Sequence, residues 1–285
     1  MHSLPRRSIL AAVMIVPLAG CGGTSPSATT PPKYQLVNPG VITAATQSEQ
    51  PPFAMTDKDG KPTGFAVDLM NTACERLGMK VQYKTTNLQG MLAGLTAGQY
   101  DVGVAGVNAT PERKEQVAFS TPFYWGFNAV VTLKDRTENE PAQFAGKRVG
   151  VVSGSVQETF ATQELAGATL VKFKDQTGLL SQVLSKGIDA MVLGASSTDE
   201  YAAKYPLRIA LQRDLSQGSA FPFRKNGDPR LLADIDAQID KMIEDGTYLK
   251  LYRTYFKRPI AAPLIKEKPG LAHQVAGTDM APAAG

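Results

Sequence analysis

The segment from Thr110 to Arg113 contains residue types that start a helix and bind an anion. Threonine caps free first-turn N–H groups, and Pro111 suits the first helical position because it has no N–H to satisfy. Arg113 falls in that turn, where a forked guanidinium can bind a carboxylate beside the unpaired backbone N–H groups. Taken alone, the segment predicts only a strand-to-helix turn with a surface arginine. Its surroundings favour an anion site.

A second segment of the same kind follows the apolar run 148–152. Ser155 and Glu158 have the spacing of a capping box, which predicts that a helix starts at Val156. Gly154 lets the backbone approach whatever lies at this helix start, where free N–H groups favour an anion. Taken alone, this segment predicts a well-capped helix and no ligand.

Short apolar strands and amphipathic helices alternate around these two segments. The predicted strands are 41–45, 81–83, 100–105, 148–152, 170–173 and 188–193, and the predicted helices are 65–77, 91–97, 156–165 and 177–185. Strands separated by single helices indicate parallel sheets, and ligands bind beyond the carboxyl ends of such strands. The sequence therefore predicts an α/β fold whose site lies at the two strand-to-helix turns.

The first twenty residues have the pattern of an export signal. Arg6 and Arg7 precede an apolar run, and the tetrapeptide that ends at Cys21 resembles a lipobox, whose cysteine is lipidated after cleavage. The two arginines match a twin-arginine signal only loosely, so an ordinary basic start is favoured. We predict a signal peptide at 1–20, a lipidated Cys21 and a flexible tether over 21–38.

Composition and histidine content exclude several classes of function. The formal net charge of the 285 residues is +4, which does not indicate nucleic-acid binding. His2 and His273 lie in the expected signal and tail, so histidine triads and ordinary zinc sites are disfavoured. We predict no catalytic residue, no metal and no cofactor. Cys74 lies on the apolar face of a predicted helix and is expected to pack in the core.

Several further motifs occur in a specific order between residues 38 and 256. They are Pro51-Pro52-Phe53, Gly64-Phe65, Gly98-Gln99-Tyr100-Asp101, Phe119-Ser120-Thr121-Pro122, Gly146-Lys147-Arg148-Val149 and Asp245-Gly246-Thr247-Tyr248. With the two segments above, they resemble the bacterial extracellular amino-acid-binding proteins of ABC importers, solute-binding family 3.

The resemblance implies a fold of the type II periplasmic-binding-protein kind, with two α/β lobes joined by two crossing strands. Lobe 1 would comprise residues 39–126 and 219–258, and lobe 2 residues 127–218. Residues 259–285 are rich in Ala, Pro and Gly, and we expect a disordered tail there.

The resemblance also implies which residues hold the ligand in the cleft between the lobes. Arg113 would bind a carboxylate, assisted by the backbone of Gly106 and the side chain of Asn108. Ser155 and the amide of Val156 would contact the same carboxylate from lobe 2. One anion shared between the lobes would favour the closed state.

Four positions depart from the family pattern, and one of them is Asn108, where the family usually has Thr or Ser. Gly194 stands where the family commonly has an aspartate that binds the α-ammonium of the ligand. A buried ammonium without a partner costs several kcal/mol, so an ordinary amino acid would be poorly bound. Gln50 and Leu88 replace the family's aromatic wall residues, which would suit a polar ligand. We therefore expect a small carboxylate-bearing ligand, either an amino acid held differently or one with a modified amine.

The expected function is that of a monomeric, lipid-anchored receptor on the outer side of the cell membrane. It would deliver its solute to a permease that works with a cytoplasmic ATPase. One alternative is an exported enzyme similar to cyclohexadienyl dehydratase, for which Glu49 and Glu158 are candidate acids. Another is a sensory module for a separate signalling partner.

Overall fold

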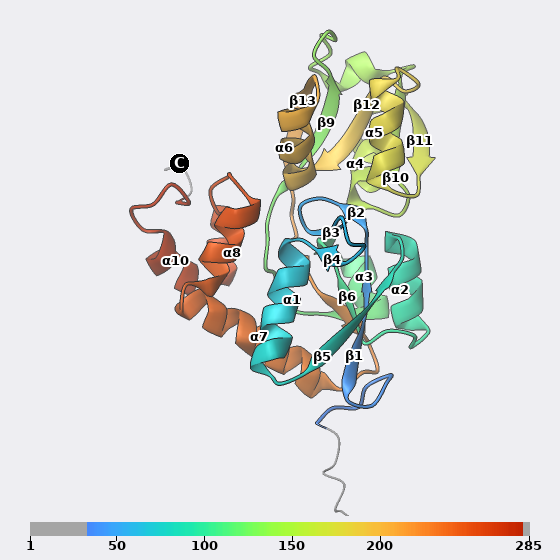
Figure 1. Cartoon of the computed structure of the whole chain (residues 1–285). Helices are drawn as coiled ribbons and strands as arrows, with labels where there is room; N and C mark the ends of the chain where they lie inside the picture. Colours follow the sequence, from blue (N-terminus) through green and yellow to red (C-terminus); the bar gives the residue numbers. More distant parts are fainter. Residues whose placement is uncertain (1–32, 282–285) are drawn as a thin grey trace, which may run out of the picture. The chain divides into compact units, whose positions relative to one another are not determined.

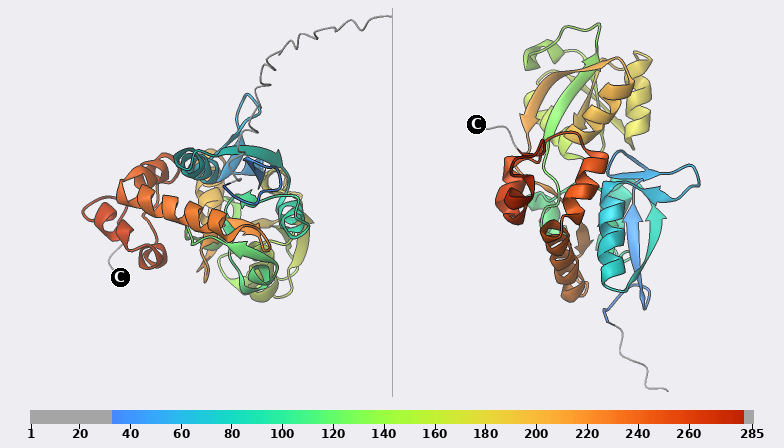
Figure 2. Two further views of the ribbon diagram at one scale, coloured as in Figure 1. Left: turned by 90° about the horizontal axis from the view of Figure 1, so that it is seen from below. Right: turned by 60° about the vertical axis from the view of Figure 1, so that its left-hand side comes forward.

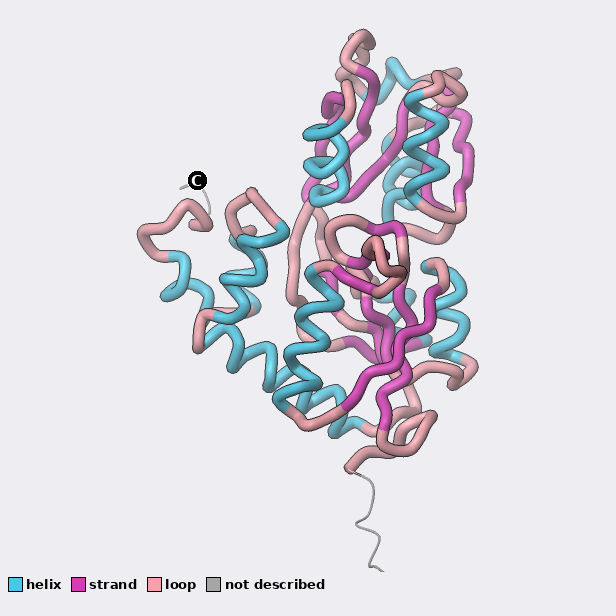
Figure 3. Tube along the Cα trace, viewed as in Figure 1, coloured by secondary structure: helices cyan, strands magenta, loops and turns pink. Residues whose placement is uncertain are grey.

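The computed structural model describes residues 33–281, and the signal peptide and lipidated Cys21 that we predict lie outside the described residues. Two five-stranded sheets with helices packed against them form the frame of two lobes, as the family resemblance implies (Figures 1 and 3). No described helix has both the length and the apolar character that a bilayer span requires.

The sheet of lobe 1 combines a parallel and an antiparallel part. Its order is β5 (Lys80–Thr85), β1 (Val41–Thr46), β6 (Val102–Val104), β15 (Pro222–Arg224) and β8 (Val117–Phe119). The first three strands are parallel, as predicted, and β15 is antiparallel to both of its neighbours. Strand β15 comes from the far end of the chain, so lobe 1 contains two separate stretches of sequence.

The remaining elements of lobe 1 pack around this sheet and form two small additional sheets. The helices are α1 (Phe65–Arg76), α2 (Leu88–Thr96), α3 (Pro111–Gln116), α7 (Pro229–Glu244) and α8 (Thr247–Tyr255); the short strands are β2 (Glu49–Gln50), β3 (Ala54–Thr56), β4 (Pro62–Thr63), β7 (Val107–Asn108) and β14 (Ser219–Ala220). Helix α2 begins three residues before the predicted position 91, because the Asn87 side chain accepts a hydrogen bond from the N–H of Gly90 and caps it there. Cys74 is buried in this lobe, as predicted.

The sheet of lobe 2 is covered on both faces. Its order is β11 (Thr169–Phe173), β10 (Arg148–Val152), β12 (Ala190–Gly194), β9 (Phe127–Leu133) and β13 (Leu207–Asp214). Helices α5 (Gln176–Leu184) and α6 (Ala195–Lys204) bury one face, and α4 (Val156–Glu164) with the 3₁₀ turn Pro141–Phe144 buries the other. The three parallel strands match the predicted ones, and β9 and β13 add an antiparallel edge.

Two segments connect the lobes, one entering β9 and the other leaving β13. They are joined to each other, because the indole Nε1 of Trp125 donates to the carbonyl of Leu215 at 2.9 Å and the N–H of Leu215 donates to the carbonyl of Gly126 at 3.1 Å. We propose the lobe boundaries 126/127 and 218/219, since each large sheet falls on one side of them.

The predicted flexible tether is wrong for its last residues. Tyr34 is 2% exposed, and its hydroxyl donates to Asp234 on α7 at 2.6 Å. The N–H groups of Gln35 and Val37 donate to the carboxylates of Asp228 and Asp101, both at 2.9 Å. These partners are distant in sequence, so residues 33–38 are part of lobe 1.

The predicted disordered tail is also wrong as far as residue 281. Two short helices form there, α9 (Ala262–Glu267) and α10 (Gly270–Val275), and the right-hand view of Figure 2 turns them towards the reader. Leu264, Leu271 and Val275 are buried in the core of lobe 1. Lys268 is also buried and pairs with Asp240 of α7 at 2.6 Å. The Ala, Pro and Gly content of this segment indicated disorder, but the segment also contains a few apolar residues that pack into the core of lobe 1.

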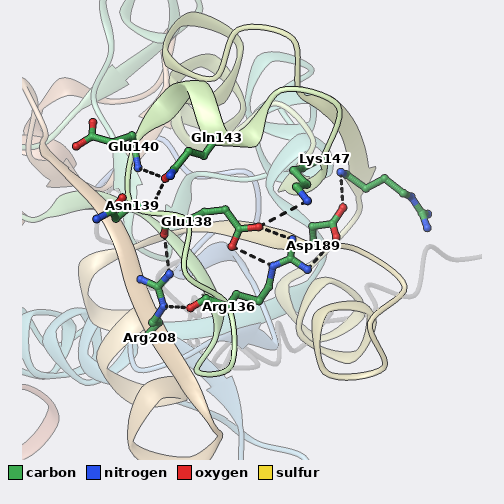
Figure 4. A network of polar contacts seen from close by, with 9 residues as sticks. Arg136, Glu138, Asn139, Glu140, Gln143, Lys147, Asp189 and Arg208 are labelled. Atoms are coloured by element: carbon green, nitrogen blue, oxygen red, sulfur yellow. Dashed lines mark hydrogen bonds and ion pairs between the residues drawn. The ribbon is translucent and has the colours of Figure 1, made fainter.

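A network of charged side chains braces lobe 2 away from the cleft (Figure 4). Arg136 bridges Glu138 at 2.6 Å and Asp189 at 3.1 Å, and Arg208 donates to the carbonyls of Arg136 and Glu138. Partial burial raises the pKa of Glu138, but the hydrogen bond from Arg136, a backbone hydrogen bond and the charges of Arg136 and Lys147 together outweigh this effect, so the pKa lies below its usual value. Lys147, at 3.7 Å from Glu138, completes the network.

Candidate functional site

The candidate site is a cleft at which the two predicted strand-to-helix turns face each other. An inner cavity of about 40 Å³ lies between them. Its lining includes every predicted ligand-binding residue except Gly194, namely Gln50, Leu88, Gly106, Asn108, Arg113, Ser155 and Val156. The structure therefore brings together side chains that are up to about a hundred positions apart in sequence.

Arg113 bridges the cleft. The Thr110 hydroxyl caps helix α3 and accepts the N–H of Arg113 at 3.4 Å, as the sequence predicts. The guanidinium donates from Nη1 to the carbonyl of Asn108 and from Nη2 to the carbonyl of Gly154 in lobe 2, both at 2.9 Å. These bonds use two of its five N–H donors, so a bidentate carboxylate can still bind. Helix α3 has only six residues, so the positive charge here comes from the guanidinium.

The surroundings of Arg113 make its positive charge costly. Burial lowers the pKa of the guanidinium to about 10, and nearby Glu112 opposes this shift weakly. At neutral pH the group is still a cation, only partly solvated and without an ion pair among the described residues. A ligand carboxylate would replace the water that the guanidinium has lost.

The loop before α4 presents backbone groups to the same point. The Ser155 hydroxyl accepts the N–H of Glu158 at 3.2 Å, which is the predicted cap. The Glu158 carboxylate reaches the N–H of Gly154 at 2.6 Å, one residue before the position expected for a capping box. Gly154 has a φ of +71°, a conformation that favours glycine, and this turns its carbonyl towards Arg113. Val156 is the first residue of the helix, so its N–H has no intrahelical acceptor.

Gln50 braces the backbone of lobe 1 at the cleft. Its side chain accepts the N–H of Gly106 at 2.9 Å and donates to the carbonyl of Gly106 at 3.1 Å. The N–H of Gly106, part of the backbone expected to assist Arg113, can therefore bind a ligand only if Gln50 moves. A side chain at position 106 would lie 2.7 Å from the ring of Phe53, so only glycine fits between this ring and the cavity.

Asn108 and Leu88 form less mobile parts of the wall. Asn108 is 8% exposed, and its Nδ2 donates to the carbonyl of Gln217 at 3.2 Å, which ties the cleft to the second crossing segment. Leu88 is buried as the first residue of α2 and belongs to the core of lobe 1. Its side chain contributes an apolar surface to the inner cavity.

Gly194 borders a second cavity, of about 50 Å³, that shares Gln50, Gly106 and Asn108 with the first. It is the N-cap residue of α6, with an extended backbone and no side chain to cap the helix. The sequence interpretation missed two side chains that line both cavities, Gln157 and Gln176. Gln157 directly follows the predicted Val156, and Gln176 opens a helix that we placed one residue too late. Their positions at the first turn of helices after parallel strands could have identified them.

Three further contacts join the lobes around the cleft. Gln89 donates to the hydroxyl of Ser153 at 3.0 Å, and the Ser197 hydroxyl donates to the carbonyl of Pro51 at 2.9 Å. Arg258 forms an ion pair with Asp199 on α6 and covers the ring of Phe127. The lobes are therefore in direct contact on more than one side of the cleft.

A wider groove of about 890 Å³ lies beyond the inner cavity. Arg113, Ser155 and Val156 border both spaces. These three residues consequently form part of the wall that separates the inner cavity from the open groove.

The two carboxylates considered for an enzyme are poorly placed for acid catalysis. Glu158 is hydrogen-bonded to Lys172 at 2.6 Å and to Gly154, and these bonds lower its pKa. A general acid needs a raised pKa, so Glu158 has the opposite property. Glu49 is absent from the lining of both cavities. Residues 33–281 contain no group of three His, Cys, Asp or Glu side chains suited to a metal ion.

The fold and the cleft define a two-lobed binding protein, and comparison with known sequences gives its family. The profile of the bacterial extracellular solute-binding proteins, family 3, matches residues 42–258. The chain belongs to this family.

Curated relatives and solved structures agree with this assignment. A probable histidine-binding protein of Campylobacter jejuni is 28% identical over 204 residues, covering 70% of this chain and 78% of the relative. A probable amino-acid ABC transporter-binding protein of Haemophilus influenzae is 26% identical over 219 residues, covering 75% and 84%. The named homologues are amino-acid-binding proteins.

Among solved structures, an ancestral arginine-binding protein bound to glutamine has a TM-score of 0.72 and 30% identity, covering 76% of this chain and 98% of that one. The ancestral amino acid-binding protein AncCDT-1, a precursor of cyclohexadienyl dehydratase, has a TM-score of 0.72 and 29% identity, covering 76% and 96%. Both matches support the type II periplasmic-binding-protein fold.

Proposed function

We propose that the protein captures an amino acid or a related small carboxylate in the cleft and delivers it to a membrane permease. One observation carries the proposal: Arg113 lies in the wall of the inner cavity, donates to backbone carbonyls of both lobes, and has unused donors without an ion pair to any carboxylate of the described residues. The named relatives that bind amino acids support the ligand class.

The site residues follow from the same proposal. Arg113 binds the carboxylate, and the Ser155 hydroxyl with the Val156 amide contacts it from lobe 2. Asn108 and Leu88 shape the wall, and Gln50 positions Gly106. Gly194 borders the opposite part of the ligand. A micromolar affinity corresponds to about −8 kcal/mol, of which a charge-assisted, partly buried carboxylate pair supplies a large share.

Substitution of Arg113 tests the proposal. Arg113→Ala leaves the carboxylate without its partner and should cost about 2–5 kcal/mol of binding. Arg113→Lys keeps the charge but loses the forked geometry, so it should bind with intermediate affinity. Titration calorimetry with a panel of amino acids and amine-free carboxylates gives the affinities. If wild-type protein and Arg113→Ala bind the same compound equally well, the assignment of Arg113 is rejected.

The remaining parts of the proposal concern export, membrane anchoring and delivery of the ligand to the permease. Residues 1–20 direct export, a lipid on Cys21 anchors the protein, and the monomer works with a permease and its cytoplasmic ATPase. A Cys21→Ser variant that remains in the membrane fraction would contradict the anchor. The two candidate acids do not favour the dehydratase alternative, because Glu158 has a lowered pKa and Glu49 lies outside the lining of both cavities.

A further inference from the structure

The Gly194 side of the cleft is lined by uncharged groups. The second cavity contacts no Asp, Glu, Lys or Arg side chain of the described residues. Its polar lining consists of amides, hydroxyls and backbone, with Gln157 and Gln176 reaching it from lobe 2. In the inner cavity the one acidic residue is Asp175, which is already used to cap α5 by accepting the N–H of Gly178 at 2.9 Å.

One amide oxygen in this lining is buried and has no partner. The Oε1 of Gln176 is inaccessible to solvent and accepts no hydrogen bond from the described residues. Burying such an acceptor without a donor destabilises the protein. Because other atoms of Gln176 line both cavities, a turn of its side chain towards a donor on the ligand would form the missing bond and remove this penalty. Gln176 therefore indicates that the bound molecule carries a hydrogen-bond donor.

The neighbouring amide is held in place by the sheet. Gln157 donates from Nε2 to Oδ1 of Asn128 at 2.8 Å, and Asn128 is 6% exposed on β9, opposite Gly194. This pair lies beside Gly194, since a side chain at that position would meet Gln157 Nε2 at 3.6 Å. The fixed groups next to a ligand here are thus neutral dipoles, which stabilise a cation much less than a carboxylate does.

The cavities are also small. Their volumes are about 40 and 50 Å³. A molecule with a long cationic side chain would force the lobes apart and break contacts such as Ser197 to Pro51. A compact molecule would fill the space and keep them.

We infer that the cleft selects a compact carboxylate whose second polar group is an uncharged N–H or O–H donor, such as a hydroxy acid or an N-acylated small amino acid. Arg113 binds the carboxylate, and Gln176 accepts the neutral donor beside Gln157 and Gly194. Amino acids with cationic side chains are rejected by size and because the second cavity contacts no carboxylate. The inference rests on the proposed function and narrows its ligand class.

Four compounds test this selection by calorimetry on the wild-type protein: L-lactate, N-acetylglycine, L-alanine and L-arginine. We expect one of the first two to bind at least tenfold more tightly than L-alanine, and no heat with L-arginine. Binding of L-alanine or L-arginine at least as tight as that of both neutral-donor acids overturns the inference and leaves the proposed function standing. No heat with any of the four overturns both.

A matched pair of variants isolates the role of charge. Gly194 has φ −78° and ψ 163°, which any residue can adopt, and the space beside it is open apart from Gln157. Asp and Asn are both good N-cap residues, so Gly194→Asp and Gly194→Asn should fold. We expect Gly194→Asp to bind L-alanine at least tenfold more tightly than wild type, and Gly194→Asn to show no such gain. Equal affinities of the two variants for L-alanine would contradict the inference that a missing negative charge limits the binding of ordinary amino acids in the cleft.

Discussion

The aromatic rings in the core of lobe 1 pack against one another, whereas lobe 2 has a few separate rings among aliphatic side chains on both faces of one sheet. The ring of Phe65 meets six other aromatic rings of lobe 1, with that of Phe256 at 5.0 Å between centroids. Among its described residues, lobe 2 has one aromatic pair, Tyr201 with Tyr205. The aromatic core reaches the cleft through Phe53, which packs against Gly106.

The two lobes also supply different polar groups to the cleft. Lobe 1 supplies the cation, Arg113. Lobe 2 supplies a serine hydroxyl, backbone N–H groups, the amides of Gln157 and Gln176, and the carboxylate of Asp175, which caps α5. A cation in a partly buried wall needs rigid support, because any movement changes its solvation. The comparison suggests that lobe 1 fixes the carboxylate and lobe 2 discriminates the rest of the ligand.

The largest effect is expected from the aromatic core. Phe65→Ala should cost about 3–5 kcal/mol of unfolding free energy, because a fully buried ring leaves a cavity among six others. The matched lobe 2 variant, Leu179→Ala, should cost about 2–5 kcal/mol, since aliphatic packing can relax more easily. Urea unfolding followed by circular dichroism and by Trp125 fluorescence measures both. A smaller loss for Phe65→Ala than for Leu179→Ala would remove this contrast between the lobes.

A second prediction concerns the extent of lobe 1. Leu271 on α10 is fully buried, so Leu271→Ala should destabilise the protein by about 2–5 kcal/mol, towards the low end because the helix is short. His273 is exposed on the same helix, and His273→Ala should change stability by less than about 0.5 kcal/mol. Thermal unfolding of both variants provides the comparison. Identical melting temperatures would show that residues 259–281 add nothing to lobe 1.

The smallest effect is expected where the lobes touch outside the cleft. Arg258 pairs with Asp199 across the lobes, and both side chains are partly exposed. Such pairs contribute ~0.2–1 kcal/mol, so Asp199→Asn should weaken ligand binding by no more than about fivefold. Glu200 pairs with Lys204 inside α6, and Glu200→Gln should leave the affinity unchanged. Equal effects of the two variants on the dissociation constant would mean that the Arg258 pair does not favour closure.

Local chemistry predicted the parts of the fold that depend on neighbouring residues. The caps at Thr110 and Ser155 act over three residues, and both are found where the sequence places them. The start of α2 was missed because Asn87 was not considered as a cap. Parallel pairing followed from single helices between strands.

Long-range contacts decide the parts that the sequence did not predict. Residues 33–38 are held in place by hydrogen bonds to residues such as Asp228 and Asp234. Amino-acid composition does not predict pairings between residues so far apart in sequence. The unpartnered oxygen of Gln176 is likewise a property of the assembled cleft. The eight predicted ligand-binding residues remain proposals, and the structure places all of them along two adjoining cavities.

Arg113 borders the open groove as well as the inner cavity, so the residue that we propose binds the carboxylate also lies between the bound ligand and the groove. Its hydrogen bond to the carbonyl of Gly154 links the lobes at this boundary. On the proposed function, Arg113 would therefore influence both the affinity for the ligand and the rate of its release towards the groove. A substitution that lowers the affinity for the carboxylate at this position should also shorten the time for which the ligand remains bound.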